Sequence, residues 1–492
     1  MKHTIPQGKE VQVKRIFSVL VVVISVLVAA SVVSGKGEDN SFIDESGSRI
    51  TVKKPFRRII SLYGAHTENL FSLGLDREII GVSENEAYPP QAMTRPIFSY
   101  HDDAEKFIAA RPDLVLIRPM IAQGYKNLIA KLQKAGITVV SLQPNTMEEV
   151  YAYWRNLGKL TGREGQARKM IGQFQAGIRK INSLVKAIPL SERKRVYFEA
   201  IHSKMKTFSP SSIAIFALKT AGGVNIAHDA EALRGTNIAA YGKEHILSRA
   251  DEIDVYLAQR GVMNRAKVEY IREEGGFKAI RAVREGKIYI IDEKIVSRPT
   301  LRLLDGIHEI GSILYPARFN DVTPFKKKAI ITRAEFAEMF IKMMNIPLKT
   351  PDYRHDIQKR PETRHRYGDF RDVNYTGNDY KFIETAVYRG LFPEVNRYEF
   401  YPDAPMKRRS VACSLFVHFD LPEAKPVVIG DIKDSDPLFN QIQTAVGLGI
   451  MKLNRDGKFL PDGPVSGGEL FQIISKATTQ VQSSMVHGSR LD

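Results

Sequence analysis

Aromatic, histidine and arginine side chains recur in loops that directly follow short apolar segments of this chain. In an open α/β sheet, loops at the carboxyl ends of strands are where ligands bind. Arginine pairs with carboxylates or phosphates, aromatic rings cover flat ring systems, and a histidine nitrogen ligates metals. We therefore expect a ligand-binding cleft lined by eight side chains: Tyr63, His66, Tyr88, Arg118, His202, Phe208, Arg260 and Arg298.

The stretch 58–74 predicts how the first of these loops is positioned. Residues 59–62 form an apolar strand, 63–66 a polar turn, and an apolar helix follows with Thr67 as its expected N-cap. Three more strands are expected at 78–82, 113–117 and 137–142. Alternating strands and helices favour a parallel sheet covered on both faces. A nucleotide-binding βαβ unit is the alternative, but the turn has no glycine-rich phosphate loop.

A second alternation of the same kind follows a long helical stretch. Residues 146 to about 185 are helical in pattern, with one break near 162–165. Strands are then expected at 195–200, 254–258 and 287–291, and helices at 213–221 and 298–314. The predicted class is α/β: two lobes, each a mainly parallel sheet flanked by helices, joined by a long helical connector and followed by a small all-α repeat module.

The order of loops and lobes over 41–319 closely resembles the periplasmic binding proteins that deliver cobalamin, ferric siderophores or haem to ABC importers. The resemblance implies a receptor with no intrinsic cofactor, which captures an iron or cobalt chelate and hands it to a membrane permease. His66 stands where the family usually has a small polar residue, which makes it a candidate axial metal ligand. The single tryptophan, Trp154, falls in the connector and not in the second lobe, which argues against a strict cobalamin assignment.

The resemblance also implies a docking surface. In the cobalamin-binding relatives, one exposed glutamate on each lobe docks onto arginines of the permease, and the matching positions here are Glu105 and Glu244. Each lies near the start of an expected helix, where the helix dipole alone would favour an acidic side chain. The alternative is therefore that both glutamates only stabilise their helices.

The C-terminal part contains an internal repeat. Five positions align at an offset of 59 residues, namely Ala386 with Ala445, Phe400 with Phe459, 402–403 with 461–462, and Pro405 with Pro464. Upstream, we align Gly368-Asp369-Phe370 with Gly430-Asp431-Ile432 at an offset of 62, and a partial copy stands at 331–336. Repeated units of this kind stack and share a core. They resemble S-layer homology domains, whose ITRAEF-type motif is present at 331–336.

Two arginines stand out in these repeats. Arg333 and Arg408 occupy the first turns of helices, where a cation opposes the dipole. We expect both to be exposed and to bind an anionic polymer of the cell wall, such as a pyruvylated polymer or peptidoglycan. Gly467 replaces the arginine in the last copy. The alternative is that the arginines are merely tolerated and the module is a structural appendage.

The N-terminus predicts export. Basic residues precede an apolar run at 16–33, and small residues at 33–35 suit cleavage, although an uncleaved membrane anchor is the alternative. The expected organisation is 1–35 signal peptide or anchor, 41–145 lobe 1, 146–187 connector, 188–319 lobe 2, 320–346 partial repeat, 347–367 polar loop, 368–422 repeat and 428–480 repeat. The protein is therefore expected in the periplasm or at the cell envelope surface.

Composition limits the remaining functions. The formal net charge of +17 favours anionic partners, but no nucleic-acid-binding motif accompanies it, so we expect no nucleic acid partner. A single cysteine, Cys413, excludes an internal disulfide or a cysteine cluster site. No nucleophile elbow, HExxH or paired-carboxylate motif is present, so an enzyme is not expected. The competing hypothesis is a structural or adhesion protein of the cell envelope, in which the repeats carry the function.

Overall fold

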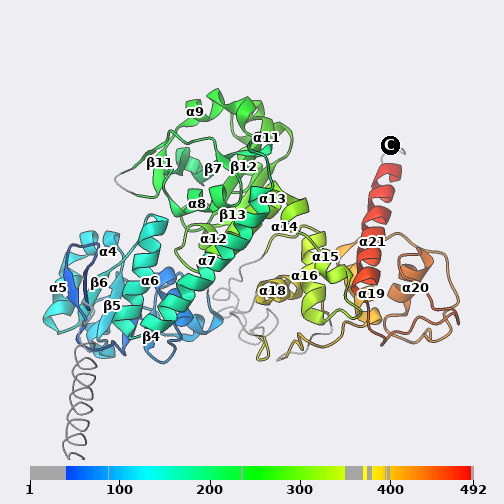
Figure 1. Ribbon diagram of the computed structural model, residues 1–492, viewed down its shortest axis with the longest axis horizontal. Helices are drawn as coiled ribbons and strands as arrows, with labels where there is room; N and C mark the ends of the chain where they lie inside the picture. The colour runs from blue at the N-terminus through cyan, green and yellow to red at the C-terminus, as the bar shows by residue number, and fades with distance from the viewer. Residues whose placement is uncertain are drawn as a thin grey trace, which may run out of the picture.

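The structure, a computed structural model, describes residues 40–86, 88–233, 236–348, 370–373, 379–393, 395 and 399–488. Figure 1 shows a first lobe in blue and cyan, a second lobe in green, and a C-terminal module in yellow to red. The expected signal or anchor at 1–35 and nearly all of the expected polar loop at 347–367 lie outside these ranges. Among the described residues, none of the helices has the length and apolar character needed to span a membrane.

The first lobe is built on a four-stranded parallel sheet in the order β4-β3-β5-β6. Its strands are almost entirely buried, which explains why they read as apolar runs without alternation. The strands are β3 (Ile59–Ser61), β4 (Ile79–Val82), β5 (Leu114–Ile117) and β6 (Thr138–Ser141). A hairpin of β1 (Ser41–Ile43) and β2 (Arg49–Thr51) precedes them. The helical elements are α2 (Gly64–Ser72), η1 (Pro90–Thr94), α3 (Ala104–Ala110), α4 (Pro119–Gly124) and α5 (Lys126–Lys134).

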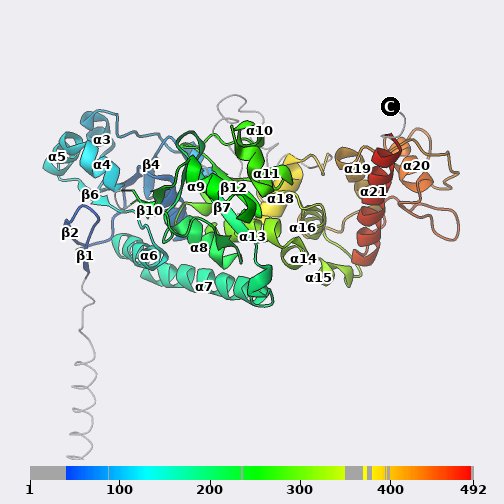
Figure 2. The same ribbon diagram turned by 90° about the horizontal axis from the view of Figure 1, so that it is seen from above.

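The connector consists of α6 (Met147–Thr161) and α7 (Glu164–Lys186), which lie along one side of both lobes (Figure 2). Thr146 and Glu149 form a capping box that starts α6, and Gly162, with φ of 66°, ends it. The inner face of the connector is apolar: Trp154 of α6 packs against Phe174 of α7 with ring centroids 5.3 Å apart. Both rings are buried in a core cluster that includes residues of both lobes, so the connector is part of the core.

The second lobe contains a mixed sheet in the order β10-β11-β8-β7-β12-β13. β7, β12 and β13 are parallel, whereas β8, β11 and β10 extend the sheet as antiparallel strands. The strands are β7 (Arg195–Ile201), β8 (Lys206–Phe208), β9 (Val224–Asn225), β10 (Glu231–Ala232), β11 (Ile238–Ala240), β12 (Val255–Arg260) and β13 (Ile288–Asp292). The helical elements are η2 (Leu190–Glu192), η3 (His202–Lys204), α8 (Ile213–Thr220), α9 (Lys243–Ser248), η4 (Ala250–Glu252), α10 (Val268–Glu273), η5 (Phe277–Ala279), α11 (Arg281–Arg284), α12 (Glu293–Val296), α13 (Leu303–Leu314) and α14 (Pro316–Phe319).

The C-terminal module has its own hydrophobic core. Its described helices are α15 (Thr323–Lys326), α16 (Arg333–Met343), α18 (Tyr380–Tyr388), α19 (Arg408–His418), α20 (Phe439–Gly447) and α21 (Gly467–Gly488). One residue from each copy, just before the second helix of that copy, takes part in a closed ring of three backbone hydrogen bonds. Met406 N–H donates to Ile331 O at 2.8 Å, Val465 N–H to Met406 O at 3.1 Å, and Ile331 N–H to Val465 O at 2.9 Å. The three copies therefore close on one another.

The predicted fold class is confirmed, while two local predictions were wrong. Thr67 does not cap α2, because that helix already begins at Gly64 and the Thr67 hydroxyl instead donates to Ser61 Oγ at 2.8 Å. The helix expected from Arg298 begins only at Leu303. Residues 298–302 stay outside the helix, where their polar groups contact the first lobe.

Candidate ligand-binding cleft and repeat module

Side chains at the ends of three adjacent strands form a polar row on the first lobe. Tyr63 follows β3, Arg118 follows β5 and Gln143 comes shortly after β6. The Arg118 guanidinium lies over the Tyr63 ring at 4.6 Å, and its Nε donates to Gln143 Oε1 at 2.9 Å. All three are partly exposed. The row places a cation and an aromatic ring side by side at this edge of the sheet, and ligand binding by Tyr63 and Arg118 stays a prediction.

The second lobe presents His202 at the end of β7, backed by a buried carboxylate. Glu199 is 1% exposed and accepts hydrogen bonds from His202 Nδ1 at 2.7 Å and from the Tyr256 hydroxyl at 2.6 Å. Asn264 Nδ2 donates to the other Glu199 oxygen at 3.0 Å. The hydrogen bond to Glu199 raises the pKa of His202 and outweighs its partial burial. His202 is therefore held in one orientation, with its Nε2 3.7 Å from Glu274.

Arg298 brings the two lobes together. It lies beyond β13 and α12 in the second lobe, yet its Nη2 donates to Asn85 O in the loop after β4 at 3.3 Å. It also approaches Gly64 so closely that a Cβ there would lie 2.3 Å from its Nη1. The neighbouring Glu86 is buried, and desolvation raises its pKa despite hydrogen bonds from Ser83. Arg298 is thus 6% exposed and sits at the interface between the lobes.

Exposed apolar side chains that follow two strands, one in α4 after β5 and two in the loop after β12, were missed by the sequence analysis. Met120, two residues after Arg118, is 49% exposed. Val262 and Met263, in the loop after β12, are 66% and 57% exposed. Arg260, at the end of β12, is also exposed and forms a β-bridge with Arg265 across the base of that loop. Apolar residues in a strand-end loop are the signal that would have identified them.

Three expected cleft residues are directed elsewhere. His66 is fully buried: its Nε2 lies 3.2 Å from Ile117 O and its Nδ1 2.7 Å from the Tyr153 hydroxyl, and burial lowers its pKa to about 3. With both ring nitrogens engaged, His66 has none left for a metal. Phe208 is 1% exposed and packs on Phe198, with centroids 4.8 Å apart. Tyr88 is half-buried and contacts Tyr380 of the C-terminal module.

Comparison with known proteins identifies both parts of the chain. Residues 59–295 match the family described as periplasmic binding protein. This range is a periplasmic binding protein domain. Residues 429–471 match the S-layer homology domain. Both resemblances predicted from the sequence are therefore confirmed over these ranges.

Two curated relatives each match a little over half of this chain. An uncharacterised ABC transporter substrate-binding lipoprotein of Bacillus subtilis (strain 168) is 26% identical over 56% of this chain and 86% of its own length. A vitamin B12-binding protein of Vibrio cholerae is 23% identical over 53% of this chain and 91% of its own length. A solved structure from Staphylococcus epidermidis, described as a possible iron-binding (periplasmic solute-binding) protein, is 27% identical, with a TM-score of 0.47, over 53% of this chain and 100% of that chain.

The two glutamates expected to dock on a permease both lie in the first turns of helices on the binding protein domain. Glu105 is in α3, with 74% of its side chain exposed and Lys131 3.8 Å away. Glu244 is in α9 and is also exposed. Both carboxylates are therefore accessible, and docking onto a permease stays a prediction.

The two repeat arginines of the C-terminal module face inward. Arg408 is 9% exposed: its Nε donates to Phe459 O at 2.7 Å, its Nη2 to Lys452 O at 2.7 Å, and its Nη1 to Glu469. Arg333 is half-buried, and its Nε donates to Phe400 O at 2.8 Å. Each arginine therefore joins its own copy to the phenylalanine loop of the next. The expectation that both are exposed was wrong, because each side chain turns inward to hydrogen-bond backbone carbonyl groups of the next copy.

The internal alignment of the repeats also needs one correction. Asp372 accepts hydrogen bonds from Phe400 N–H and Tyr401 N–H at 2.9 and 2.6 Å. In the next copy, Asp431 accepts the equivalent pair of hydrogen bonds from Phe459 N–H and Leu460 N–H, at 2.6 and 2.7 Å. Asp372 is thus the counterpart of Asp431, at the same offset of 59 as the phenylalanines. The offset of 62 matched similar letters at positions with different roles.

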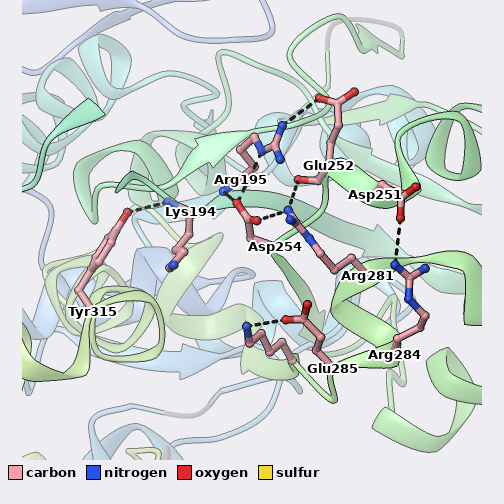
Figure 3. Close-up of polar contacts among 10 residues, drawn as sticks. Lys194, Arg195, Asp251, Glu252, Asp254, Arg281, Arg284, Glu285 and Tyr315 are labelled. Atoms are coloured by element: carbon pink, nitrogen blue, oxygen red, sulfur yellow. Dashed lines mark hydrogen bonds and ion pairs between the residues drawn. The ribbon is translucent and has the colours of Figure 1, made fainter. Parts of the chain in front are cut away.

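A separate hollow lies at the opposite, amino ends of β12 and β13, away from the strand-end loops. It is lined by Lys194, Asp254, Val255, Arg281, Glu285, Lys287, Tyr289, Ile313 and Leu314. Figure 3 shows that most of its charges pair within the protein. Arg281 binds Asp254, which also accepts from Arg195 N–H at 2.7 Å, and Lys287 pairs with Glu285 at 2.6 Å. These pairs leave little net charge for a ligand, so we assign no site there.

Proposed function

We propose that this protein is an extracytoplasmic receptor of an ABC importer, which captures an iron or cobalt chelate and delivers it to a membrane permease. The observation that carries the proposal is that each lobe presents candidate ligand-binding side chains at the ends of its strands. Tyr63 and Arg118 stand on one lobe and His202 and Arg260 on the other, while Arg298 bridges the lobes. A ligand between such surfaces would meet cations, aromatic rings and apolar groups together.

These side chains favour a large chelate that carries carboxylates or other anionic groups. Arg118 and Arg260 supply charge, and the raised pKa of His202 adds a cation at moderately acidic pH. The exposed Met120, Val262 and Met263 suit the apolar surface of a macrocycle or a siderophore. The name of one relative adds support, since the protein of Vibrio cholerae is described as vitamin B12-binding.

Delivery would depend on Glu105 and Glu244. Their exposure on helices of separate lobes supports docking onto cationic residues of a permease. The S-layer homology domain supports attachment of the receptor to an anionic polymer of the cell envelope. In this proposal Arg333 and Arg408 maintain the shape of the module, and other residues of the module make the polymer contact.

The test is a titration of the purified full chain with three probes: haemin, cyanocobalamin and a ferric hydroxamate. Saturable binding at micromolar concentration or below to one of them is expected, measured by calorimetry. Arg118→Ala and Arg260→Ala should each weaken the binding of an anionic chelate by about tenfold, since each lost charge-assisted contact is worth roughly 1.5 kcal/mol. Arg455→Ala, at an exposed position of the repeat module, is the matched control. No saturable binding to any probe would overturn the proposal.

A further inference from the structure

The C-terminal module contacts both lobes at the point where α18 begins. Lys381 Nζ forms an ion pair with Asp305 Oδ1 of α13 in lobe 2, at 2.5 Å, and each side chain is about a quarter exposed. The adjacent Tyr380 packs its ring against Tyr88 of lobe 1, with centroids 6.1 Å apart and planes at 70°. Two consecutive side chains of one helix therefore reach two different lobes.

Arg302 forms an ion pair between the two lobes next to these contacts. Its Nε and Nη2 donate to the two carboxylate oxygens of Glu68 in α2, at 2.9 and 2.8 Å. The pair is nearly excluded from water, with side chains 11% and 2% exposed. The Arg302 guanidinium also lies over the Tyr88 ring at 4.5 Å. Tyr88 is thus in contact with lobe 2 and the module at once.

The backbone next to Arg302 is fixed to lobe 1 and to the connector. Pro299 O accepts hydrogen bonds from Asn69 Nδ2 at 2.9 Å and from Trp154 Nε1 at 3.0 Å. The module has a second attachment where the chain enters it, because Asn320 accepts a hydrogen bond from Ser312 Oγ of α13 at 2.9 Å and its Nδ2 donates to Asn345 Oδ1 at 2.8 Å. A module attached at two separate points cannot swing as a tail on a single link would.

We propose that the C-terminal module is a clamp on the binding protein domain: through Tyr380 and Lys381 it holds residues 83–86 and 88–91 of lobe 1 against the start of α13 in lobe 2. This role is additional to envelope attachment. The loop that it holds also contains Asn85, whose carbonyl accepts the hydrogen bond from Arg298 at the interface of the lobes. A change at α18 therefore reaches the strand-end surfaces without any direct contact between the module and a ligand.

The test is amide hydrogen exchange of peptides covering 83–91 in the full chain without ligand, so the result does not depend on the proposed function. Lys381→Glu places two carboxylates together and should speed exchange in this loop several-fold, while exchange in β5 stays unchanged. The double variant Lys381→Glu with Asp305→Lys restores an ion pair and should return exchange to the original rate. Lys407→Glu breaks an ion pair with Asp462 elsewhere in the module and is the matched control.

Two results would overturn the clamp. One is exchange at 83–91 that is the same in Lys381→Glu as in the unmodified chain. The other is an increase that Lys407→Glu reproduces, because that would show a general loosening of the module. Tyr380→Ala is a second variant that leaves the ion pair in place, and it should also speed exchange at 83–91 by removing the ring contact with Tyr88.

Discussion

Arg408 reaches from the first turn of α19 to the carbonyl oxygen of Phe459 in the next repeat, and its guanidinium lies over the ring of the same phenylalanine at 4.7 Å. Arg333 makes the same contact with Phe400 one repeat earlier. A cation at a helix start is thereby explained without an external anion, since its partners are a carbonyl and a ring of the neighbouring copy. The arginine belongs to the interface between repeats.

Arg408→Ala should therefore destabilise the module. The substitution removes hydrogen bonds from a buried cation to two carbonyls and to Glu469, and hydrogen bonds to charged groups are worth about 1.5–3 kcal/mol. We expect a lower unfolding temperature of the module in calorimetry. Lys407→Ala, which breaks only an exposed ion pair, should cost about 1 kcal/mol or less. Equal losses in both variants would contradict the structural role of Arg408.

The last copy has Gly467 in place of the arginine, so its junction with the neighbouring copy closes without that cation. Two adjacent glycines test how tightly this junction is packed. A Cβ on Gly467 would lie 1.7 Å from Phe325 O, whereas a Cβ on Gly468 would have its nearest neighbour, Lys326 O, at 3.5 Å. Gly467→Ala should cost about 1–3 kcal/mol or more through overpacking against backbone. Gly468→Ala should be neutral or stabilising, because alanine is the better helix former by about 1 kcal/mol. Urea unfolding of the two variants measures the difference. Similar stabilities of the two variants would show that the junction has room for a methyl group at position 467.

The docking hypothesis predicts that substituting the two glutamates impairs chelate uptake and leaves ligand binding unchanged. Glu105→Lys with Glu244→Lys should abolish chelate uptake in cells while ligand affinity, measured on purified protein, stays unchanged. Glu148→Lys is the matched control, because Glu148 is also exposed in the first turn of a helix and carries the same dipole cost of about 0.3–1 kcal/mol. Loss of ligand affinity in the double variant would show that the glutamates are misplaced.

Stability should depend on pH through Glu309 of α13. Burial, with the charges of Asp292 and Asp305, raises the pKa of Glu309 to about 8 from its ordinary value of 4.5. Its contribution to stability is therefore complete below pH 4.5 and is lost as pH rises towards 8. Buried His308, whose pKa burial lowers to about 3, acts oppositely and loses its contribution as pH falls below 6.5. Glu309→Gln should reduce the fall in unfolding temperature between pH 5 and 8.5, and Glu105→Gln, at an exposed site, should not.

The sequence predicted which residues lie in loops after buried strands. It did not predict where a side chain points when contacts with residues distant in sequence decide its direction. Tyr63 and Arg118 follow buried strands, so their loops could be placed from strand pattern alone. His66 follows the same strand as Tyr63, but it lies inside α2 and turns towards Tyr153, 87 residues away in the connector. Phe208 ends β8, an antiparallel strand whose partners β7 and β11 bury it. A loop position in the sequence cannot tell which way its side chain points.

The repeats show the same limit. Letter matching placed Asp369 opposite Asp431, whereas the carboxylate that receives the two backbone N–H groups belongs to Asp372, three residues later. The role depends on the loop at Phe400, which is distant in sequence, so only the folded arrangement reveals it. The inward direction of Arg408 was hidden for a similar reason, since its partners Lys452, Phe459 and Glu469 belong to the following copy.

The closed ring of Ile331, Met406 and Val465 has a consequence for how the chain folds. Its last hydrogen bond joins residues 331 and 465, so the ring closes only after the final copy is present. Contacts of such long sequence separation fold slowly, because the entropy of closing the loop is lost before the contacts form. Until then the core of the module lacks the buried residues of the last copy, among them Leu470, Ile473 and Ile474. A chain interrupted before Val465 would therefore be prone to aggregation and would depend on chaperones during synthesis.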